Sequence, residues 1–257
     1  MSYFEDYASF ISEHNFAQDE AIPDRLILRQ TDDLVTYFAP FDYINDSARI
    51  FICDITPGPK QAVAALKAAQ RQLNIGNDIN MASKAAASVP RYCDTMVDNL
   101  VAMLDHIGAA TLLGLRSTEE LFDEKSHLVH YSSLTRYPVM VANQSFNGDP
   151  CVMTHPDLRW QLDTFLTEEV LQLRDALFVP LGYRVQEVFG YFASSGIVDA
   201  RRILSGLPHP CAANAERIKY FLGSKPEVYA SSYADASRIR RNCDQLMNKV
   251  AAEIPHL

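Results

Sequence analysis

The chain has 257 residues, of which 48% are hydrophobic and 21% charged, and its formal net charge is −9. This composition is ordinary for a globular protein with a well-filled core, and no apolar stretch approaches the roughly 18 to 20 residues that a membrane span requires. The acidic balance weighs against strong non-specific binding to a polyphosphate.

The cysteines and the amino terminus narrow the class of protein further. Five cysteines lie far apart without any Cys-x-x-Cys pair, so we expect no disulfide framework, no metal, no iron–sulfur cluster and no other cofactor. The first residues are acidic and polar, which is unlike a secretory or transit peptide and favours a cytoplasmic protein without membrane contact. No repeat or linker interrupts the chain, which predicts a single domain over residues 1–257, with residues 1–47 and 224–257 as extensions packed on it.

The first part of the chain predicts a helix, two short extended segments and a buried strand. Residues 4–15 have a helical pattern, and residues 25–30 and 34–41 are typical of strands or extended segments. The apolar run within residues 48–59 ends at a Pro-Gly-Pro turn and fits a strand buried on both faces. Alanine and leucine then recur at helical spacing over residues 60–73.

Three more apolar runs follow a long, mostly helical interval at residues 85–135. Residues 137–145 and 202–210 each read as a strand, and residues 175–192 read as a strand that leads into a helix. Residues 215–223 are helical in pattern and end at a glycine suited to a helix C-cap. Strands that alternate with helices predict a three-layer α/β/α fold with a central four-stranded, mainly parallel sheet.

The predicted strands end in residues that can form hydrogen bonds or tight turns. Ligands of open α/β sheets lie beyond the carboxyl ends of the strands. We therefore expect one site built from the residues that follow each predicted strand, which are Asp54 to Pro59, Asn143 to Ser145, Leu181 to Tyr183, and His209 to Cys211. Taken singly, several of these residues are also explained as turn residues or helix caps.

Four short motifs in this order resemble the uracil-DNA glycosylase superfamily. They are "DITPGP" at residues 54–59, Asn143 after "VMVA", "ALFVPLGYRVQEV" at residues 176–188, and "HPCAANAER" at residues 209–217. The resemblance spans roughly residues 38–223, and the first motif is closest in form to the mismatch-specific and single-strand-selective classes.

The resemblance implies a role for each matching residue. His209 would donate a hydrogen bond to the base oxygen on which negative charge develops, and the position of Thr56 is the one that holds the attacking water. Asn143 would pair with the edge of the base, with Ile55, Pro57 and Gly58 beside it. The residues implied to enter the DNA groove once the base has flipped out are Pro210, Cys211, Ala212 and Asn214.

Two positions depart from the motif of the active members. Thr56 stands where they carry Asp or Asn, and Asp54 stands where they usually carry Gly. Side chains two residues apart in an extended segment point to the same side. Asp54 can therefore either supply the missing carboxylate as a third catalytic residue or repel a base or phosphate by its bulk and charge. The loop after His209 also lacks a large apolar wedge.

The sequence leaves two main functions open. The first is a DNA N-glycosylase-like hydrolase that removes uracil or another damaged base from DNA, as in base excision repair. The alternative is a catalytically impaired or retargeted member of the same fold that binds a free nucleobase, a nucleotide or a protein partner. An α/β domain of unrelated function is the third reading.

Overall fold

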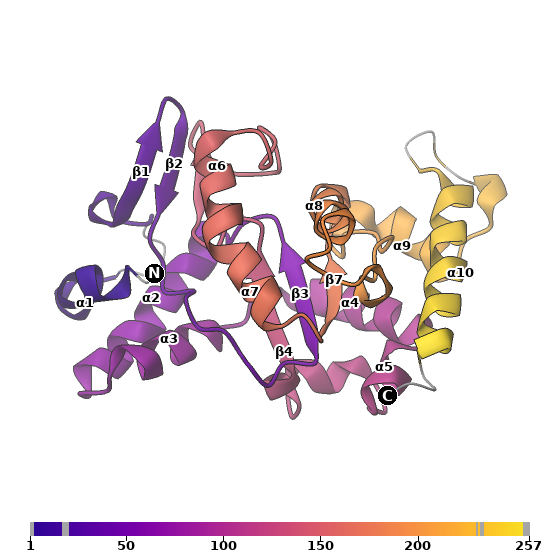
Figure 1. The fold of residues 1–257 in the computed structure, drawn as a ribbon, viewed down its shortest axis with the longest axis horizontal. Coiled ribbons are helices and arrows are strands. Elements are labelled where there is room, and N and C mark those ends of the chain that lie inside the picture. The colour runs from indigo at the N-terminus through magenta and orange to yellow at the C-terminus, as the bar shows by residue number, and fades with distance from the viewer. Residues whose placement is uncertain (1–2, 17–20, 230, 232–233, 254–257) are drawn as a thin grey trace. The chain divides into compact units, whose positions relative to one another are not determined.

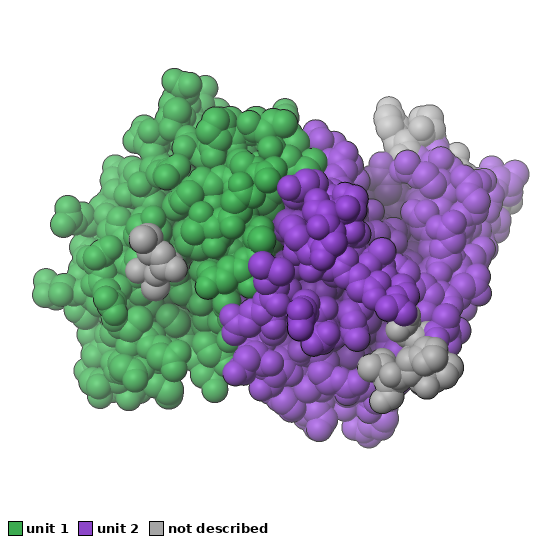
Figure 2. Space-filling view, viewed as in Figure 1, with its two compact units in different colours: residues 1–44, 54–91, 131–169 green, residues 45–53, 92–130, 170–257 purple. Residues whose placement is uncertain are grey.

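The computed structural model describes every residue of the chain except 1–2, 17–20, 230, 232–233 and 254–257. The chain forms two compact units, each assembled from three segments (Figure 2). Unit 1 comprises residues 1–44, 54–91 and 131–169, and unit 2 comprises residues 45–53, 92–130 and 170–257. The single domain over residues 1–257 stays a prediction, and parts of its extensions 1–47 and 224–257 lie outside the described residues.

Unit 1 combines helices with a small antiparallel sheet (Figure 1). Its helices are α1 (Phe4–Glu13), α2 (Pro59–Asn74), α3 (Ile79–Ala87), α6 (Pro156–Gln161) and the first half of α7 (Thr167–Gln172). Its strands, in the order β1-β2-β5-β6, are β1 (Ile27–Thr31), β2 (Leu34–Tyr37), β5 (Val139–Val141) and β6 (Gln144–Ser145). The helices and extended segments predicted over residues 4–41 and 60–73 are confirmed in kind.

Helix α2 shows how the sequence produces this unit. Gly58 is its N-cap and Pro59 its first residue, a position that suits proline because its missing N–H has no helical partner there. Ala62, Leu66 and Ala69 of the following turns are buried in a core that includes Tyr137. The small alanines let neighbouring elements approach closely, and the buried apolar area stabilises the unit.

A second sheet has the strand order β4-β3-β7. Its strands are β4 (Val129–Ser133), β3 (Ile50–Asp54) and β7 (Leu177–Pro180). Strands β3 and β7 run parallel and side by side (Figure 1), in a register that pairs Ile50 with Leu177 and Cys53 with Pro180. All residues of β7 and the first four of β3 are buried, as the unbroken apolar runs predicted.

Helices make up most of the rest of unit 2. They are α4 (Asp94–His106), α5 (Ala109–Leu113), α8 (Tyr183–Ser194), α9 (Ala215–Phe221) and α10 (Ala236–Glu253). The Phe189 ring of α8 lies 6.2 Å from that of Phe51 in β3 and 5.4 Å from that of Phe178 in β7, between centroids. Helix α8 therefore packs on the β3–β7 pair.

The α/β class is thus confirmed, but the predicted four-stranded parallel sheet is wrong. Residues 137–145 form the antiparallel hairpin β5–β6 instead of a parallel strand. Its two-residue turn, Ala142-Asn143, has φ values of 47° and 62°, which are the left-handed values that a tight hairpin needs.

The strand predicted over residues 202–210 is also wrong. Only Ile203 makes an isolated parallel bridge, to Phe178 of β7. Beyond it, Gly206 has a φ of 121°, and Pro208 and Pro210 have no N–H to donate to a neighbouring strand. These residues end the pairing before it becomes a fourth strand.

The strand that the sequence did not predict is β4. It lies in an interval read as helical, and His130, Ser132 and Ser133 interrupt its apolar pattern although all three are buried. In the same interval, residues 118–128 form 3₁₀ turns at Thr118–Phe122 and Ser126–Leu128 instead of an α-helix. No helix among the described residues is long and apolar enough to cross a membrane.

Candidate functional site

The carboxyl ends of β3 and β7 begin the candidate site. Cys53 is paired with Pro180, and the N–H of Leu181 donates to the carbonyl of Cys53 over 2.8 Å. Asp54 follows Cys53 directly, and Gly182 follows Leu181. Two of the four predicted segments thus leave the sheet at the same edge, where α/β proteins bind their ligands.

The loop that carries His209 lies against this edge. Gly182 has a φ of 84°, and a Cβ atom placed on it would lie 3.6 Å from Cδ2 of His209. The imidazole therefore rests against the backbone that joins β7 to α8. A side chain at residue 182 would be strained by the positive φ, although its Cβ would make only an ordinary van der Waals contact with this ring.

A backbone hydrogen bond sets the protonation pattern of His209. The N–H of Cys211 donates to Nδ1 of His209 over 3.2 Å. A neutral imidazole that accepts at one nitrogen carries its proton on the other. Nε2 of His209 is therefore a hydrogen-bond donor in the neutral ring, and the half-buried side chain does not depend on a positive charge for that property.

The other residues of this loop hold its shape. The buried Pro210 accepts at its carbonyl from Nδ2 of Asn99 in α4 over 2.8 Å. Asn214 donates through Nδ2 to the carbonyl of His209 over 3.1 Å and to Sγ of Cys211 over 3.4 Å. Ala212 is exposed and begins the 3₁₀ turn Ala212–Asn214. This part of the loop therefore presents a small, exposed surface next to a fixed imidazole.

The segment after β3 is held by the main chain of residues 134–139. The carbonyl of Asp54 accepts from the N–H of Leu134 over 2.8 Å, and that of Ile55 accepts from Thr135 over 3.2 Å. Oδ1 of Asp54 accepts from the N–H of Ile55 over 2.7 Å. Pro57 is buried and precedes the N-cap residue of α2.

Thr56 is the centre of this segment, and its hydroxyl is used within the protein. Its Oγ1 accepts from the Thr135 hydroxyl over 2.9 Å and from the N–H of Val139 over 3.1 Å. A hydroxyl oxygen has two lone pairs, so Thr56 retains only its own proton for a further hydrogen bond. It can donate to a water molecule, but it cannot accept a proton from one.

Asn143 lies elsewhere in the fold than predicted. It is exposed at the turn between β5 and β6, in the antiparallel sheet of unit 1. It does not follow a parallel strand, and its left-handed φ explains why asparagine suits the position. A base-binding role for Asn143 has no support from this location.

The predicted site residues are divided between the two units. Unit 1 contains Asp54, Ile55, Thr56, Pro57, Gly58 and Asn143, whereas unit 2 contains His209, Pro210, Cys211, Ala212 and Asn214 (Figure 2). Each group is therefore described by its own contacts. Thr56 and His209 each have a defined local environment, and their convergence on one base stays a prediction.

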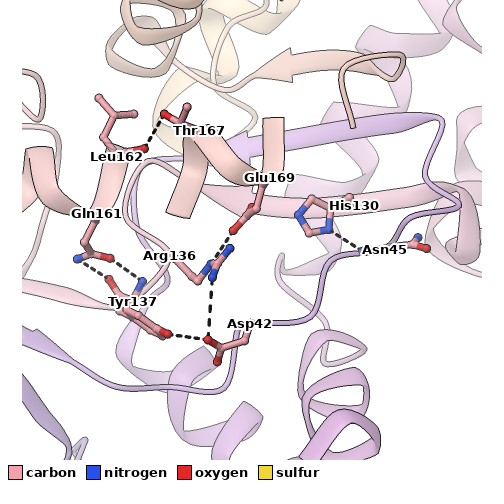
Figure 3. A network of polar contacts seen from close by, with 9 residues as sticks. All are labelled: Asp42, Asn45, His130, Arg136, Tyr137, Gln161, Leu162, Thr167 and Glu169. Atoms are coloured by element: carbon pink, nitrogen blue, oxygen red, sulfur yellow. Dashed lines mark hydrogen bonds and ion pairs between the residues drawn. The ribbon is translucent and has the colours of Figure 1, made fainter. Parts of the chain in front are cut away.

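A buried ionic cluster, which the sequence did not reveal, includes Arg136 and Tyr137 from the stretch of chain that holds the Thr56 segment. Nε of Arg136 donates to Glu169 of α7 over 2.7 Å, and its Nη1 lies 4.0 Å from Oδ1 of Asp42 (Figure 3). The hydroxyl of Tyr137 donates to the same Asp42 oxygen over 2.6 Å. No local pattern announces such a cluster, because its partners come from three distant parts of the chain.

The cluster shifts the pKa values of its members. Burial lowers the pKa of Arg136, but the Glu169 and Asp42 carboxylates outweigh that effect and raise the pKa above its ordinary value. Burial and the charge of Asp42 raise the pKa of Tyr137. Arg136 thus stays charged and Tyr137 stays protonated at neutral pH, so both keep the segment between Thr135 and Val139 in place.

Comparisons with known proteins identify a similar chain. It is the uncharacterized protein YoxB of Bacillus subtilis (strain 168), which is 27% identical over 217 residues, or 83% of this chain and 85% of that protein. No protein-family model and no solved structure matches. The name of this relative states no activity, so the function is argued from the residues of the site.

A metal centre finds no support in the described residues. No group of three or more His, Cys, Asp or Glu side chains among them is placed to hold a metal ion. The candidate site does contain the His209 imidazole, which accepts a hydrogen bond from the Cys211 N–H at Nδ1.

Proposed function

We propose that the protein is a DNA N-glycosylase-like hydrolase that acts on uracil or another modified base. The observation that carries the proposal is the hydrogen bond from the Cys211 N–H to Nδ1 of His209, which makes Nε2 the donor. Negative charge develops on an oxygen of the departing base, and a hydrogen-bond donor that is held in a fixed position stabilises such a charge. The sequence resemblance supports the same reaction.

The reaction is the hydrolysis of the bond between C1′ of the sugar and the nitrogen of the base. As this bond breaks, its electron pair leaves with the base, which becomes an anion, while the sugar gains oxocarbenium character. Nε2–H of His209 would donate to the base oxygen on which that charge collects. Removing a fixed donor of this kind typically costs about 10²- to 10³-fold in rate.

The water step is the weaker half of the proposed mechanism. Water adds its oxygen to C1′ and loses a proton to bulk water, and the departed base anion takes up a proton in turn. Thr56 has no free lone pair to assist the loss of that proton. Loss of general-base assistance typically costs about 10²- to 10⁴-fold. We therefore propose slow turnover that depends mainly on stabilisation of the departing base.

The distribution of charge is compatible with a DNA substrate. Although the whole chain is acidic, lysine and arginine outnumber aspartate and glutamate within residues 170–257, the segment that carries His209. Local basic residues can attract phosphate groups even where the net charge of the protein is negative.

The test is the direct detection of abasic sites. Single- and double-stranded oligonucleotides that contain uracil, hypoxanthine or xanthine are incubated with the protein and then treated with alkali, which cleaves the strand at each abasic site. We expect cleavage of at least one substrate by the wild-type protein and its loss with His209→Ala. Absence of abasic product from every substrate would overturn the proposal.

A second candidate function is binding of a free nucleobase or nucleotide without hydrolysis. The contacts of Thr56 favour it, because they leave no group at this position that accepts the proton of water. A ligand that binds only the folded state raises the apparent melting temperature. Thermal unfolding with a panel of nucleobases and nucleotides therefore tests it, and an unchanged melting temperature across the panel would count against it.

A further inference from the structure

The loop between Ile203 and α9 contains main-chain carbonyl groups that require hydrogen-bond donors from outside a β-ladder. It does not pair with a neighbouring strand beyond Ile203, so its carbonyl groups have no ladder partners. Pro208 and Pro210 flank His209 and cannot donate. A half-buried loop of this kind requires donors from elsewhere, because unpaired buried carbonyls are costly.

Side-chain amides from three places meet this need. Nε2 of Gln186 in α8 donates to the carbonyl of Leu207 over 3.1 Å. Nδ2 of Asn214 donates to the carbonyl of His209 over 3.1 Å, and Nδ2 of Asn99 in α4 donates to that of Pro210 over 2.8 Å. The carbonyls of residues 207, 209 and 210 are each held by a separate amide, a set that we name the amide clamp.

The amide of Asn214 is itself oriented. Nη1 of Arg217 donates to its Oδ1 over 2.6 Å, which leaves Nδ2 to face the carbonyl of His209. The N–H of Asn214 also donates to the carbonyl of Cys211 over 2.9 Å. Asn214 thus contacts the main chain at both His209 and Cys211. These are the two residues that the hydrogen bond from the Cys211 N–H to Nδ1 of His209 joins.

We infer that Asn99 and Gln186 are positioning residues that keep His209 in the form with its proton on Nε2. They touch neither the imidazole nor a reacting atom. They fix the main chain at residues 207 and 210, and so hold the Cys211 N–H within reach of Nδ1. The inference rests on the proposed function only in naming His209 as the functional group.

The design of the test follows from the chemistry of the amides. Asn99→Asp and Gln186→Glu keep the shape of each side chain but replace the donating NH₂ with an oxygen. Asn248→Asp and Gln245→Glu, at exposed positions on α10, introduce the same changes away from the loop and serve as matched controls. Circular dichroism establishes whether each variant is folded. Because Asn99 and Gln186 lie on different helices, either variant alone can test the inference if the other does not fold.

The readout is the state of the His209 ring, measured by long-range ¹H–¹⁵N NMR of the neutral imidazole. Its signals are assigned by their absence in His209→Gln. We expect the wild-type protein and both controls to show protonated Nε2, and both test variants to shift toward a mixture of the two neutral forms. Hydrogen exchange at the Cys211 amide should accelerate about 2- to 10-fold in each test variant, the effect of losing one neutral hydrogen bond.

Two results separate this inference from the proposed function. Ring signals in Asn99→Asp and Gln186→Glu that match those of the wild-type protein would overturn the clamp, whatever the enzymatic activity. A shift in the ring signals of a protein that releases no base would support the clamp and count against the hydrolase.

Discussion

At the scale of single residues, His209 and Thr56 have different local environments, although the sequence predicted a catalytic role for both. His209 accepts a backbone hydrogen bond at Nδ1 and lies against Gly182, so it has the form of a fixed donor. Thr56 accepts two hydrogen bonds from residues 135 and 139 and so links two segments of unit 1. The first arrangement suits chemistry on a ligand, whereas the second suits structural support.

These roles predict an order of effects on base release. His209→Ala should lower the rate of abasic-site formation by about 10²- to 10³-fold, because a preorganised donor is lost. Thr56→Ala should cost less, because Thr56 has no lone pair left to assist water. Single-turnover rates on the best oligonucleotide substrate measure both, and an equal or larger loss for Thr56→Ala would contradict the ordering.

At the scale of elements, the hairpin β5–β6 shows how a short apolar run acquires its direction. Residues 139–141 are apolar enough for a buried parallel strand, but Ala142 and Asn143 both adopt positive φ. That geometry turns the chain back on itself and makes the pairing antiparallel. Asn143 tolerates such a conformation, whereas alanine does so only at a cost.

Replacing Ala142 should therefore stabilise the protein. Ala142→Gly removes the clash of Cβ in the left-handed region and should raise the free energy of unfolding by about 1 kcal/mol. The matched control is Ala102→Gly, at an exposed position inside α4, which should lower it by about 1 kcal/mol because glycine is a poor helix former. Urea unfolding measures both changes, and a loss of stability in Ala142→Gly would contradict the turn.

At the scale of the whole molecule, the chain passes repeatedly between its two units, since each consists of three separate segments. The buried Arg136 cluster belongs to unit 1, where it joins residue 42, residues 136–137 and α7. Trp160, the single tryptophan, also lies in unit 1. Its fluorescence reports on that unit, whereas far-ultraviolet circular dichroism reports on both.

Loss of Arg136 should destabilise the entire molecule. Arg136→Ala leaves two buried carboxylates without their guanidinium and should lower the free energy of unfolding by about 3 to 5 kcal/mol. Because the units share interleaved segments, we expect the fluorescence and circular dichroism transitions to shift together. Arg201→Ala, which removes an exposed ion pair with Asp199, should leave both transitions in place. A shift seen by fluorescence alone would show that the units unfold separately.

Much of the fold can be read from the sequence because its signals are local. The Pro-Gly-Pro turn and the spaced alanines specify the start and buried face of α2, and the unbroken apolar runs specify β3 and β7. The strand predicted over residues 202–210 was wrong, although Pro208 and Pro210 beside His209 lack the N–H groups that a strand ladder there would need.

Only the tertiary structure decided which strands pair and which distant side chains form hydrogen bonds. The polar segment 129–133 became a strand because its serines and histidine are buried beside β3, and the hairpin at residues 142–143 removed Asn143 from the parallel sheet. The amide clamp and the Arg136 cluster join residues that lie far apart in the chain. Local sequence patterns reflect backbone preference and burial. A hydrogen bond between distant residues depends on how the whole chain folds, so no single segment of the sequence predicts it.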